Sequence, residues 1–338
     1  MASATAQIAW YERRLAANWR TSAAANAVAI TAAASGKTHT EAEHTEPAPT
    51  GEADGGPRGC FVAAASIAIV TSEPGARRPK LLCSTVSLFG TSLHQAFPLI
   101  ADAGFEGVEV MVTRDPDTRD PDRLRELSED HGLVIEAIHA PFLVMSRTVW
   151  GTDPVAKISR ATELAKRVGA RLVVVHPPYR WQTAYRRWLD EDLPGRSETE
   201  VRIAIENMFP VRVRGRKVVS VHGGQSLEHL VRHPDVVLDT SHAAVAGLDL
   251  FETVSRLGDR LSHIHLSNNA GRGWDSHLPV DQGVLPLDRF LGSVATEGFH
   301  GAISLELDLR RYRNDLDRLR RVLAHNRRFC ESRLSLAV

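Results

Sequence analysis

A repeated pattern constrains the fold of this chain more than any other feature. Short apolar runs end in a potential metal ligand, and this occurs at six places: His139, His176, Glu206, Asp239, His265 and Glu306. Burying an ionised carboxylate is costly unless the group is paired or binds a metal. Segments with helical spacing separate most of the runs, and strands that alternate with helices pair in parallel. We therefore expect an α/β protein in which polar side chains gather at the strand ends.

Eight apolar segments qualify as strands, and they cover roughly 250 residues, the usual size of a (β/α)8 barrel. They are residues 81–86, 107–112, 133–138, 171–176, 201–206, 236–239, 261–266 and 302–306. An open doubly wound sheet is the alternative, but no GxGxxG follows the first strand, as the nucleotide-binding form would require. The pattern therefore predicts a (β/α)8 TIM barrel.

Local signals mark several of the helices between these strands. Asp120-Pro121 and Asp153-Pro154 each place a favoured N-cap before a favoured first helical residue, and Gly132 and Gly169 stand where C-caps belong. Residues 179–200 are harder to assign, and the part from 188 to 201 is short for a full barrel helix. Residues 211–232 are ambiguous.

The first 78 residues differ from the rest in composition. They are rich in Ala, Ser, Thr, Gly and Pro, and include the stretch THTEAEHTEPAPTGEADGGPRG. Such a segment has too little apolar surface to offset the entropy lost on ordering. We predict a largely disordered N-terminal extension over residues 1–78, followed by a barrel domain over residues 79–338.

Charge and cysteine content narrow the class of protein. Basic and acidic residues number 41 each, so no overall field favours nucleic acid or a membrane. Cys60, Cys83 and Cys330 form neither a disulfide framework nor a CxxC site, which suits a reducing cytoplasm. No apolar run is long enough to cross a bilayer. We expect a cytoplasmic protein with a small-molecule substrate and no membrane partner; whether it forms a homo-oligomer stays open.

The C-terminal strand ends of a parallel barrel meet at one face, where the fold places its chemistry. Nitrogen and oxygen ligands without thiolate suit Zn, Mn, Co or Fe. Asp239 on its own has a second interpretation, because an Asp after an apolar run is often a helix N-cap. His242, Asp275 and His277 follow in loops on the same face. The sequence therefore predicts a divalent-metal site at this face of the barrel.

The region from Lys80 to Phe329 resembles the xylose-isomerase-like TIM barrel superfamily. This superfamily contains sugar and sugar phosphate isomerases and epimerases together with apurinic-site endonucleases of the endonuclease IV group. One difference is that Asp281 replaces the first Gly of the Gly-x-Gly turn that usually follows the Asp-x-His motif. The motifs that carry the resemblance are Ala137-Ile138-His139-Ala140-Pro141, Val174-Val175-His176-Pro177, Ile205-Glu206-Asn207, Leu238-Asp239-Thr240-Ser241-His242, His263-Ile264-His265-Leu266, Asp275-Ser276-His277 and Leu305-Glu306.

The resemblance implies two different metal centres. The isomerases hold one divalent metal, Zn, Mn, Co or Mg, with ligands that correspond to Glu206, Asp239, His265 and Glu306. The two glutamates would be the catalytic residues, one removing a proton from the substrate and the other returning it. The endonucleases hold three zinc ions and add ligands that correspond to His139, His176, His242, Asp275 and His277.

Neutral net charge and the resemblance favour a metal-dependent isomerase or epimerase that acts on a sugar, sugar phosphate or polyol through an enediolate. The alternatives are a zinc endonuclease acting on abasic DNA, the only case with a DNA partner, and a metal-binding barrel without catalysis. His242 and Arg180 are predicted to contact substrate. Glu109 would either bind substrate or pair with a neighbouring cation. His263 is interpreted as a hydrogen-bonded core histidine.

Overall fold

The structure is a computed structural model that describes residues 78–141, 148–193, 200–213, 217–223 and 226–335. The predicted extension therefore lies outside the described residues except for Arg78, and so does Cys60. The boundary between extension and barrel stays a prediction. All the other described residues fall within the predicted barrel domain.

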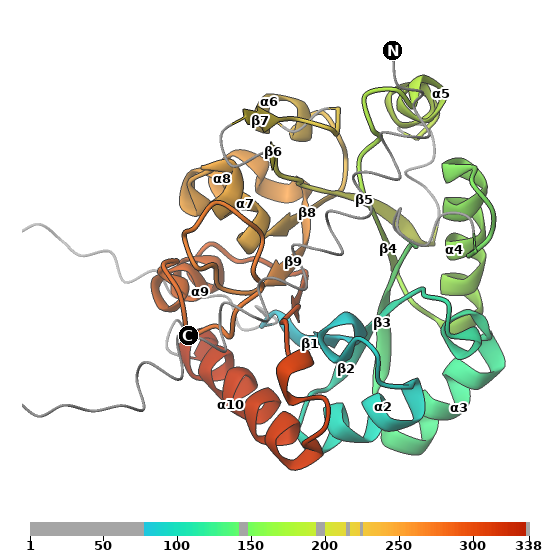
Figure 1. Cartoon of the computed structure of the whole chain (residues 1–338), viewed down its shortest axis with the longest axis vertical. Helices are drawn as coiled ribbons and strands as arrows, with labels where there is room; N and C mark the ends of the chain where they lie inside the picture. Colours follow the sequence, from blue (N-terminus) through green and yellow to red (C-terminus); the bar gives the residue numbers. More distant parts are fainter. Residues whose placement is uncertain (1–77, 142–147, 194–199, 214–216, 224–225, 336–338) are drawn as a thin grey trace, which may run out of the picture. The chain divides into compact units, whose positions relative to one another are not determined.

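Eight parallel strands close into a barrel in the order β1-β10-β9-β8-β5-β4-β3-β2, as predicted (Figure 1). Hydrogen-bonded pairing of β1 with both β2 and β10 completes the closure. The strands are β1 (Lys80–Ser84), β2 (Gly107–Met111), β3 (Val134–His139), β4 (Leu172–Val175), β5 (Arg202–Glu206), β8 (Val236–Asp239), β9 (Leu261–Leu266) and β10 (Ala302–Leu305).

The predicted strands are all present, with ends that shift by up to two residues. The largest shift is in β1, which ends at Ser84 because the chain turns into the 3-10 helix η1 (Thr85–Leu88). There Thr85 Oγ1 accepts a hydrogen bond of 2.9 Å from the Met111 backbone N–H. The Thr85 side chain thus accepts the hydrogen bond that a backbone carbonyl of a longer β1 strand would have accepted.

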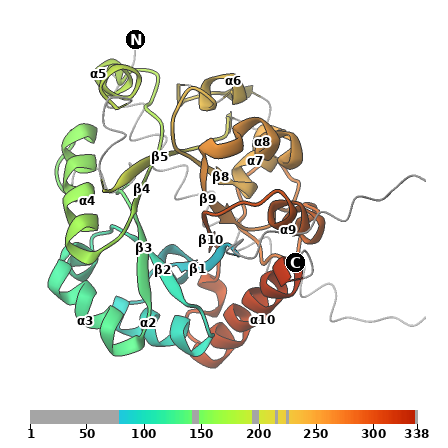
Figure 2. The same cartoon turned by 180° about the vertical axis from the view of Figure 1, so that it is seen from behind.

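Helices surround the barrel, and the same ring is seen from behind in Figure 2. Both predicted Asp N-caps are confirmed: Asp120 accepts hydrogen bonds from two backbone N–H groups, and Asp153 accepts one from Val155. Gly132 and Gly169 end their helices with left-handed φ angles of 63° and 75°. The longer helices are α2 (Leu93–Asp102), α3 (Pro121–His131), α4 (Pro154–Val168), α8 (Leu250–Leu257), α9 (Leu287–Thr296) and α10 (Leu316–Leu334), of which α10 contacts α2 and α9.

The two stretches that the sequence left undecided contain short elements. Between β4 and β5 lie α5 (Thr183–Arg187) and a π-helical turn η4 (Trp188–Asp192), so this region is indeed short for a barrel helix. Between β5 and β8 lie a hairpin of β6 (Val211–Val213) with β7 (Lys217–Val219), and then α6 (Leu227–Leu230). α7 (Thr240–Ala246) follows β8 directly.

Part of the barrel interior is an apolar cluster of small and branched side chains, which suits a packed core rather than a pore. Outside it, helices and strands bury a continuous apolar layer that includes Phe97, Phe290 and the free thiol groups of Cys83 and Cys330. Among the described residues, no helix is both long and apolar enough to cross a membrane. The inner cluster consists of Ala137, Leu172, Val174, Ala204 and Val237.

Candidate metal centre

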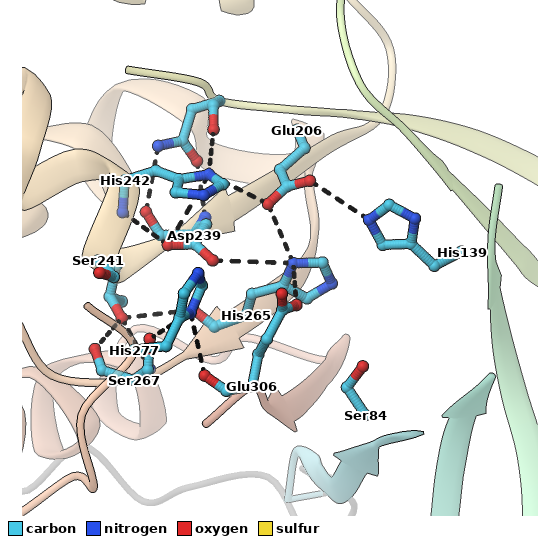
Figure 3. Close-up of polar contacts among 12 residues, drawn as sticks. Ser84, His139, Glu206, Asp239, Ser241, His242, His265, Ser267, His277 and Glu306 are labelled. Carbon is cyan, nitrogen blue, oxygen red and sulfur yellow. Dashed lines mark hydrogen bonds and ion pairs between the residues drawn. The ribbon is translucent and has the colours of Figure 1, made fainter. Parts of the chain in front are cut away.

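The strand ends bring the predicted ligands together at one face of the barrel (Figure 3). His139 ends β3, Glu206 ends β5, Asp239 ends β8 and His265 lies in β9, and none of the four is more than 1% exposed. Glu306 follows β10 directly. Such burial of three carboxyl and several imidazole groups needs compensating interactions.

Glu206 lies at the centre of this group. Its Oε1 is 3.2 Å from Nδ1 of both His242 and His265. Its Oε2 is 3.1 Å from Nε2 of His176 and 3.5 Å from Nε2 of His139. The two oxygens of one carboxylate therefore face two different sets of histidines.

His265 joins the remaining carboxylates of the predicted four-residue site. Its Nδ1 is 3.1 Å from Glu306 Oε2 and 3.9 Å from Asp239 Oδ2, in addition to its contact with Glu206. Carboxylates at the C-terminal ends of β5, β8 and β10 thus approach one imidazole nitrogen on β9. We call these residues, Glu206, Asp239, His265 and Glu306, the four-residue group.

A third set of ligands lies at the rim. Asp275 Oδ2 is 2.7 Å from His277 Nε2 and 3.4 Å from His242 Nε2. His277 has a positive φ of 40°, a conformation that is uncommon for a residue other than glycine. The replacement of glycine by Asp281 does not disturb this arrangement, because Asp281 points to His325 at 2.8 Å while Gly283, two residues on, keeps the positive φ of 130°.

Asp239 caps a helix, which confirms one of the two interpretations that its sequence position allowed, and its other carboxylate oxygen faces the site. Its Oδ1 accepts a 2.7 Å hydrogen bond from the His242 backbone N–H and so caps α7. Its own backbone N–H donates to Asn207 Oδ1 at 2.6 Å, and Asn207 Nδ2 donates back to the Asp239 carbonyl at 3.1 Å. The cap and the Asn207 bridge hold the carboxylate so that Oδ2 faces the site.

Hydrogen bonds to the backbone also orient the imidazole rings. Nδ1 of His139 lies 2.9 Å from the Ala140 carbonyl, and Nδ1 of His242 lies 2.9 Å from the Asn207 carbonyl. Nδ1 of His277 lies 3.1 Å from the Glu306 carbonyl. Since a carbonyl can only accept, each Nδ1 carries a proton, and these hydrogen bonds set the orientation of the three rings.

The electrostatics of the site follow from this crowding. Burial by itself would raise the pKa of the Glu206 carboxyl, but the imidazoles of His265, His176 and His242 hold that pKa well below its ordinary value. Burial would lower the pKa of His265, yet the carboxylates of Glu109 and Glu306 hold it well above. The site therefore attracts positive charge strongly.

A divalent cation fits this donor set. Three carboxylate oxygens are buried and receive no hydrogen bond from the residues that the structure describes: Glu206 Oε2, Asp239 Oδ2 and Glu306 Oε2. All three belong to the four-residue group, and the ligand atoms of Asp239, His265 and Glu306 lie within 4.8 Å of one another. Carboxylate and imidazole donors without thiolate suit Zn or Mn.

The remaining predicted residues lie around this centre in different ways. Glu109 is fully buried, with Oε2 2.7 Å from His263 Nε2 and 3.0 Å from His265 Nε2. These contacts favour the pairing interpretation of Glu109, and they confirm that His263 is a buried, hydrogen-bonded histidine. Arg180 is exposed on the loop after β4. Asn207 was only part of a motif in the sequence, and its role depends on the fold.

Comparison with known proteins agrees with this geometry. Residues 97–326 match the family described as xylose isomerase-like TIM barrel. The chain belongs to this family. It is 33% identical over 258 residues to an uncharacterized protein of Mycobacterium leprae, covering 71% of this chain and 92% of that protein.

Solved structures with this fold come from both branches of the superfamily. D-allulose 3-epimerase from Methylomonas sp., in complex with D-allulose, has a TM-score of 0.56 and 18% identity, covering 76% of this chain and 97% of that one. AP endonuclease, family 2 from Brucella melitensis has a TM-score of 0.52 and 18% identity, covering 69% and 94%. At this level of identity the likeness supports the shared fold alone.

Proposed function

We propose that this protein is a divalent-metal-dependent isomerase or epimerase that acts on a sugar, a sugar phosphate or a related polyol. The reaction would move a proton at a carbon next to a carbonyl group, through an enediolate. The metal would be held by the four-residue group, and the catalytic residues would be Glu206 and Glu306.

One observation carries the proposal. Glu206 Oε1 and Glu306 Oε2 approach the same nitrogen, His265 Nδ1, at 3.2 and 3.1 Å. Two carboxylates that flank one metal position give a base and an acid on either side of a bound substrate. The family match and an epimerase structure that contains D-allulose support a small sugar as the substrate class.

The mechanism assigns a task to each residue. A bound divalent cation would polarise the substrate carbonyl or hydroxyl group. Glu206 would remove the proton from carbon, and Glu306 would return one to the opposite face or to the neighbouring carbon. His242 would contact a substrate oxygen, since it lies at the same face of the barrel and is held in place by the Asn207 carbonyl. Burial of the site would keep water from competing for these protons.

A second candidate is a zinc endonuclease. It is favoured by the two-sided contacts of Glu206, whose Oε2 faces His139 and His176, and by the separate rim set of His242, Asp275 and His277. A carboxylate that bridges two ions and a third ion nearby would suit phosphodiester cleavage. Metal content per chain separates the two: about three zinc ions would favour the endonuclease, and one ion would favour the isomerase.

Proton exchange tests the isomerase proposal directly. Metal-loaded protein is incubated with D-allulose in D2O, and deuterium incorporation at carbon is followed by NMR. Glu206→Gln keeps the shape of the side chain but removes the base, so exchange should fall by about 10²–10⁴-fold. Glu228→Gln, an exposed glutamate on α6, is the matched control and should exchange at the wild-type rate.

Two results would count against the proposal. Wild-type turnover that survives Glu206→Gln would remove the proposed base from the mechanism. Absence of deuterium exchange with ketoses and inositols, combined with cleavage of an abasic DNA duplex, would favour the endonuclease over the isomerase. Metal binding without either activity would leave a non-catalytic metal-binding barrel.

A further inference from the structure

A pocket opens beside the metal centre and shares His176 with it. The space inside the pocket, including its open mouth, is about 540 Å³. Its walls come from the ends of β3 and β4, the start of α4, the loop after β4 that carries Tyr179, and the segment after β7 that carries His222. Because these are C-terminal strand ends, the pocket lies on the face where barrels bind their substrates.

Lys157, in the second turn of α4, lines this pocket and is only 5% exposed. No carboxylate or hydrogen-bond acceptor is found for its ammonium group among the described residues, although its backbone N–H donates to the Asp153 carbonyl at 3.1 Å. Burial lowers the pKa of the Lys157 ammonium to about 8. Burying a cation without a counter-charge costs free energy, and the described residues supply no counter-charge to the Lys157 ammonium.

The polar groups around Lys157 are neutral and do not supply that charge. His222 Nδ1 donates to the Pro177 carbonyl at 2.8 Å, and burial lowers its pKa to about 3, which leaves Nε2 as an acceptor. The Tyr185 hydroxyl donates to the His176 carbonyl at 2.8 Å. The pocket thus offers the Lys157 ammonium, the Nε2 acceptor of His222 and the ring of Tyr179, which stacks on His222 at 4.3 Å.

The distance from this pocket to the reacting centre is short. His176 lines the pocket while its Nε2 lies 3.1 Å from Glu206 Oε2. A substrate held at the metal would therefore extend past His176 towards Lys157. A neutral sugar would leave the Lys157 ammonium without a counter-charge, whereas an anionic group on the substrate would pair with it.

We propose that the Lys157 pocket binds an oxyanion group, a phosphate or a carboxylate, of the sugar that reacts at the metal centre. This inference rests on the proposed function and narrows its substrate class to sugar phosphates or sugar acids. Lys157 binds the anion, and His222 Nε2 accepts a hydrogen bond from a hydroxyl group of the same substrate.

Anion binding to the full-length protein, purified without chelators, tests the pocket independently of turnover. Inorganic phosphate and acetate are titrated by calorimetry into the wild type, Lys157→Met and Lys166→Met. Lys166 is exposed on the same helix and serves as the matched control. Loss of a charge-assisted contact should weaken binding by about tenfold or more in Lys157→Met alone.

The pattern of anions identifies the source of the charge. Tighter Lys157-dependent binding of phosphate would point to a sugar phosphate, and tighter binding of acetate to a sugar acid. Anion binding that is equal in Lys157→Met and Lys166→Met, or absent from the wild type, would overturn the proposal. If Lys157→Met does not fold, Lys157→Arg, which keeps the charge, should still bind the anion, and its failure to do so would count against the pocket.

The two proposals fail in different ways. A protein without proton exchange that still binds phosphate through Lys157 would have lost the isomerase assignment but kept the pocket. Exchange that is equally fast with neutral sugars and with their phosphates, together with no anion binding, would keep the isomerase and remove the pocket.

Discussion

The two sides of the metal centre differ in how open they are to the neighbouring pocket. On the side of β8 to β10, Asp239 and His277 are fixed by hydrogen bonds to Asn207 and Ser267, and His242 by the Asn207 carbonyl. On the side of β3 and β4, the His176 side chain is 23% exposed and faces the pocket. One side is organised before any ligand arrives, and the other side borders the space where a substrate would lie.

The histidine pKa values show the same contrast. Burial lowers the pKa of His176, and the nearby Glu206 does not compensate fully. Burial would also lower the pKa of His242, but the carboxylates of Asp239 and Asp275 hold it well above its ordinary value. On the β8 to β10 side several carboxylates face His242, which suits a resident cation, whereas on the β3 and β4 side Glu206 outweighs the effect of burial on the pKa of His139 but not on that of His176.

Replacing one histidine on each side should show the largest difference between the two sides. His265→Ala deletes a ligand of the four-residue group, and losing one of four ligands in sites worth about 10–16 kcal/mol should weaken metal binding on the order of a thousandfold. His176→Ala should keep the metal of the four-residue group. Elemental mass spectrometry of both variants measures the difference. Equal metal loss in both would mean that the two sides form one inseparable cluster.

The pH dependence of stability should differ between the two sides in metal-free protein. Although burial opposes it, Asp275 and Asp239 raise the pKa of His277 from 6.5 to about 10. Its contribution to stability is therefore full below pH 6.5 and is lost as the pH rises to about 10, with a slope of about 1.4 kcal/mol per pH unit at most.

His277→Gln should flatten this alkaline decline, as measured by urea unfolding of chelator-treated protein between pH 6.5 and 10. His176→Gln is the comparison. The pKa of His176 is lowered in the folded state, so its effect on stability appears only below about pH 6.5, where stability decreases as the pH falls. An alkaline decline that is unchanged in His277→Gln would show that the Asp275 pair does not contribute to it.

A smaller effect is expected from the groups that hold Asp239. Asn207→Ala leaves the buried Asp239 backbone N–H and carbonyl without their partner, which should lower the free energy of unfolding by about 1–3 kcal/mol. Ser159→Ala on the exposed side of α4 is the control and should change it little, since its hydroxyl bonds only the Val155 carbonyl. Urea unfolding measures both. If Asn207→Ala has the same free energy of unfolding as the wild type, water takes the place of the amide as hydrogen-bond partner.

Local sequence patterns were sufficient to predict most of the fold. Apolar runs located all eight barrel strands because parallel strands buried on both faces consist almost entirely of apolar residues. Asp120-Pro121 and Asp153-Pro154 located helix starts because capping depends on neighbouring residues only. The stretch 211–232 resisted assignment because its short hairpin and single helical turn lack a long hydrophobic period.

The candidate ligands could also be named from the sequence, since strand ends in a closed parallel barrel must meet. Their pairing could not. Glu206 contacts residues that lie up to 67 positions earlier and 59 positions later, His139 and His265, and only closure of the barrel brings these together. Whether Glu109 would bind substrate or pair with a neighbouring cation was undecided for the same reason.

The sequence by itself determined the strands, the helix caps and the set of residue types able to bind a divalent metal, because these depend on hydrophobic period and local hydrogen bonding. The tertiary structure decided which carboxylate oxygens are left without donors, which nitrogen each histidine presents, and that Lys157 is buried beside His176. Those properties depend on distances between residues far apart in the chain, and burial changes the energy of a charge only after the chain has folded around it.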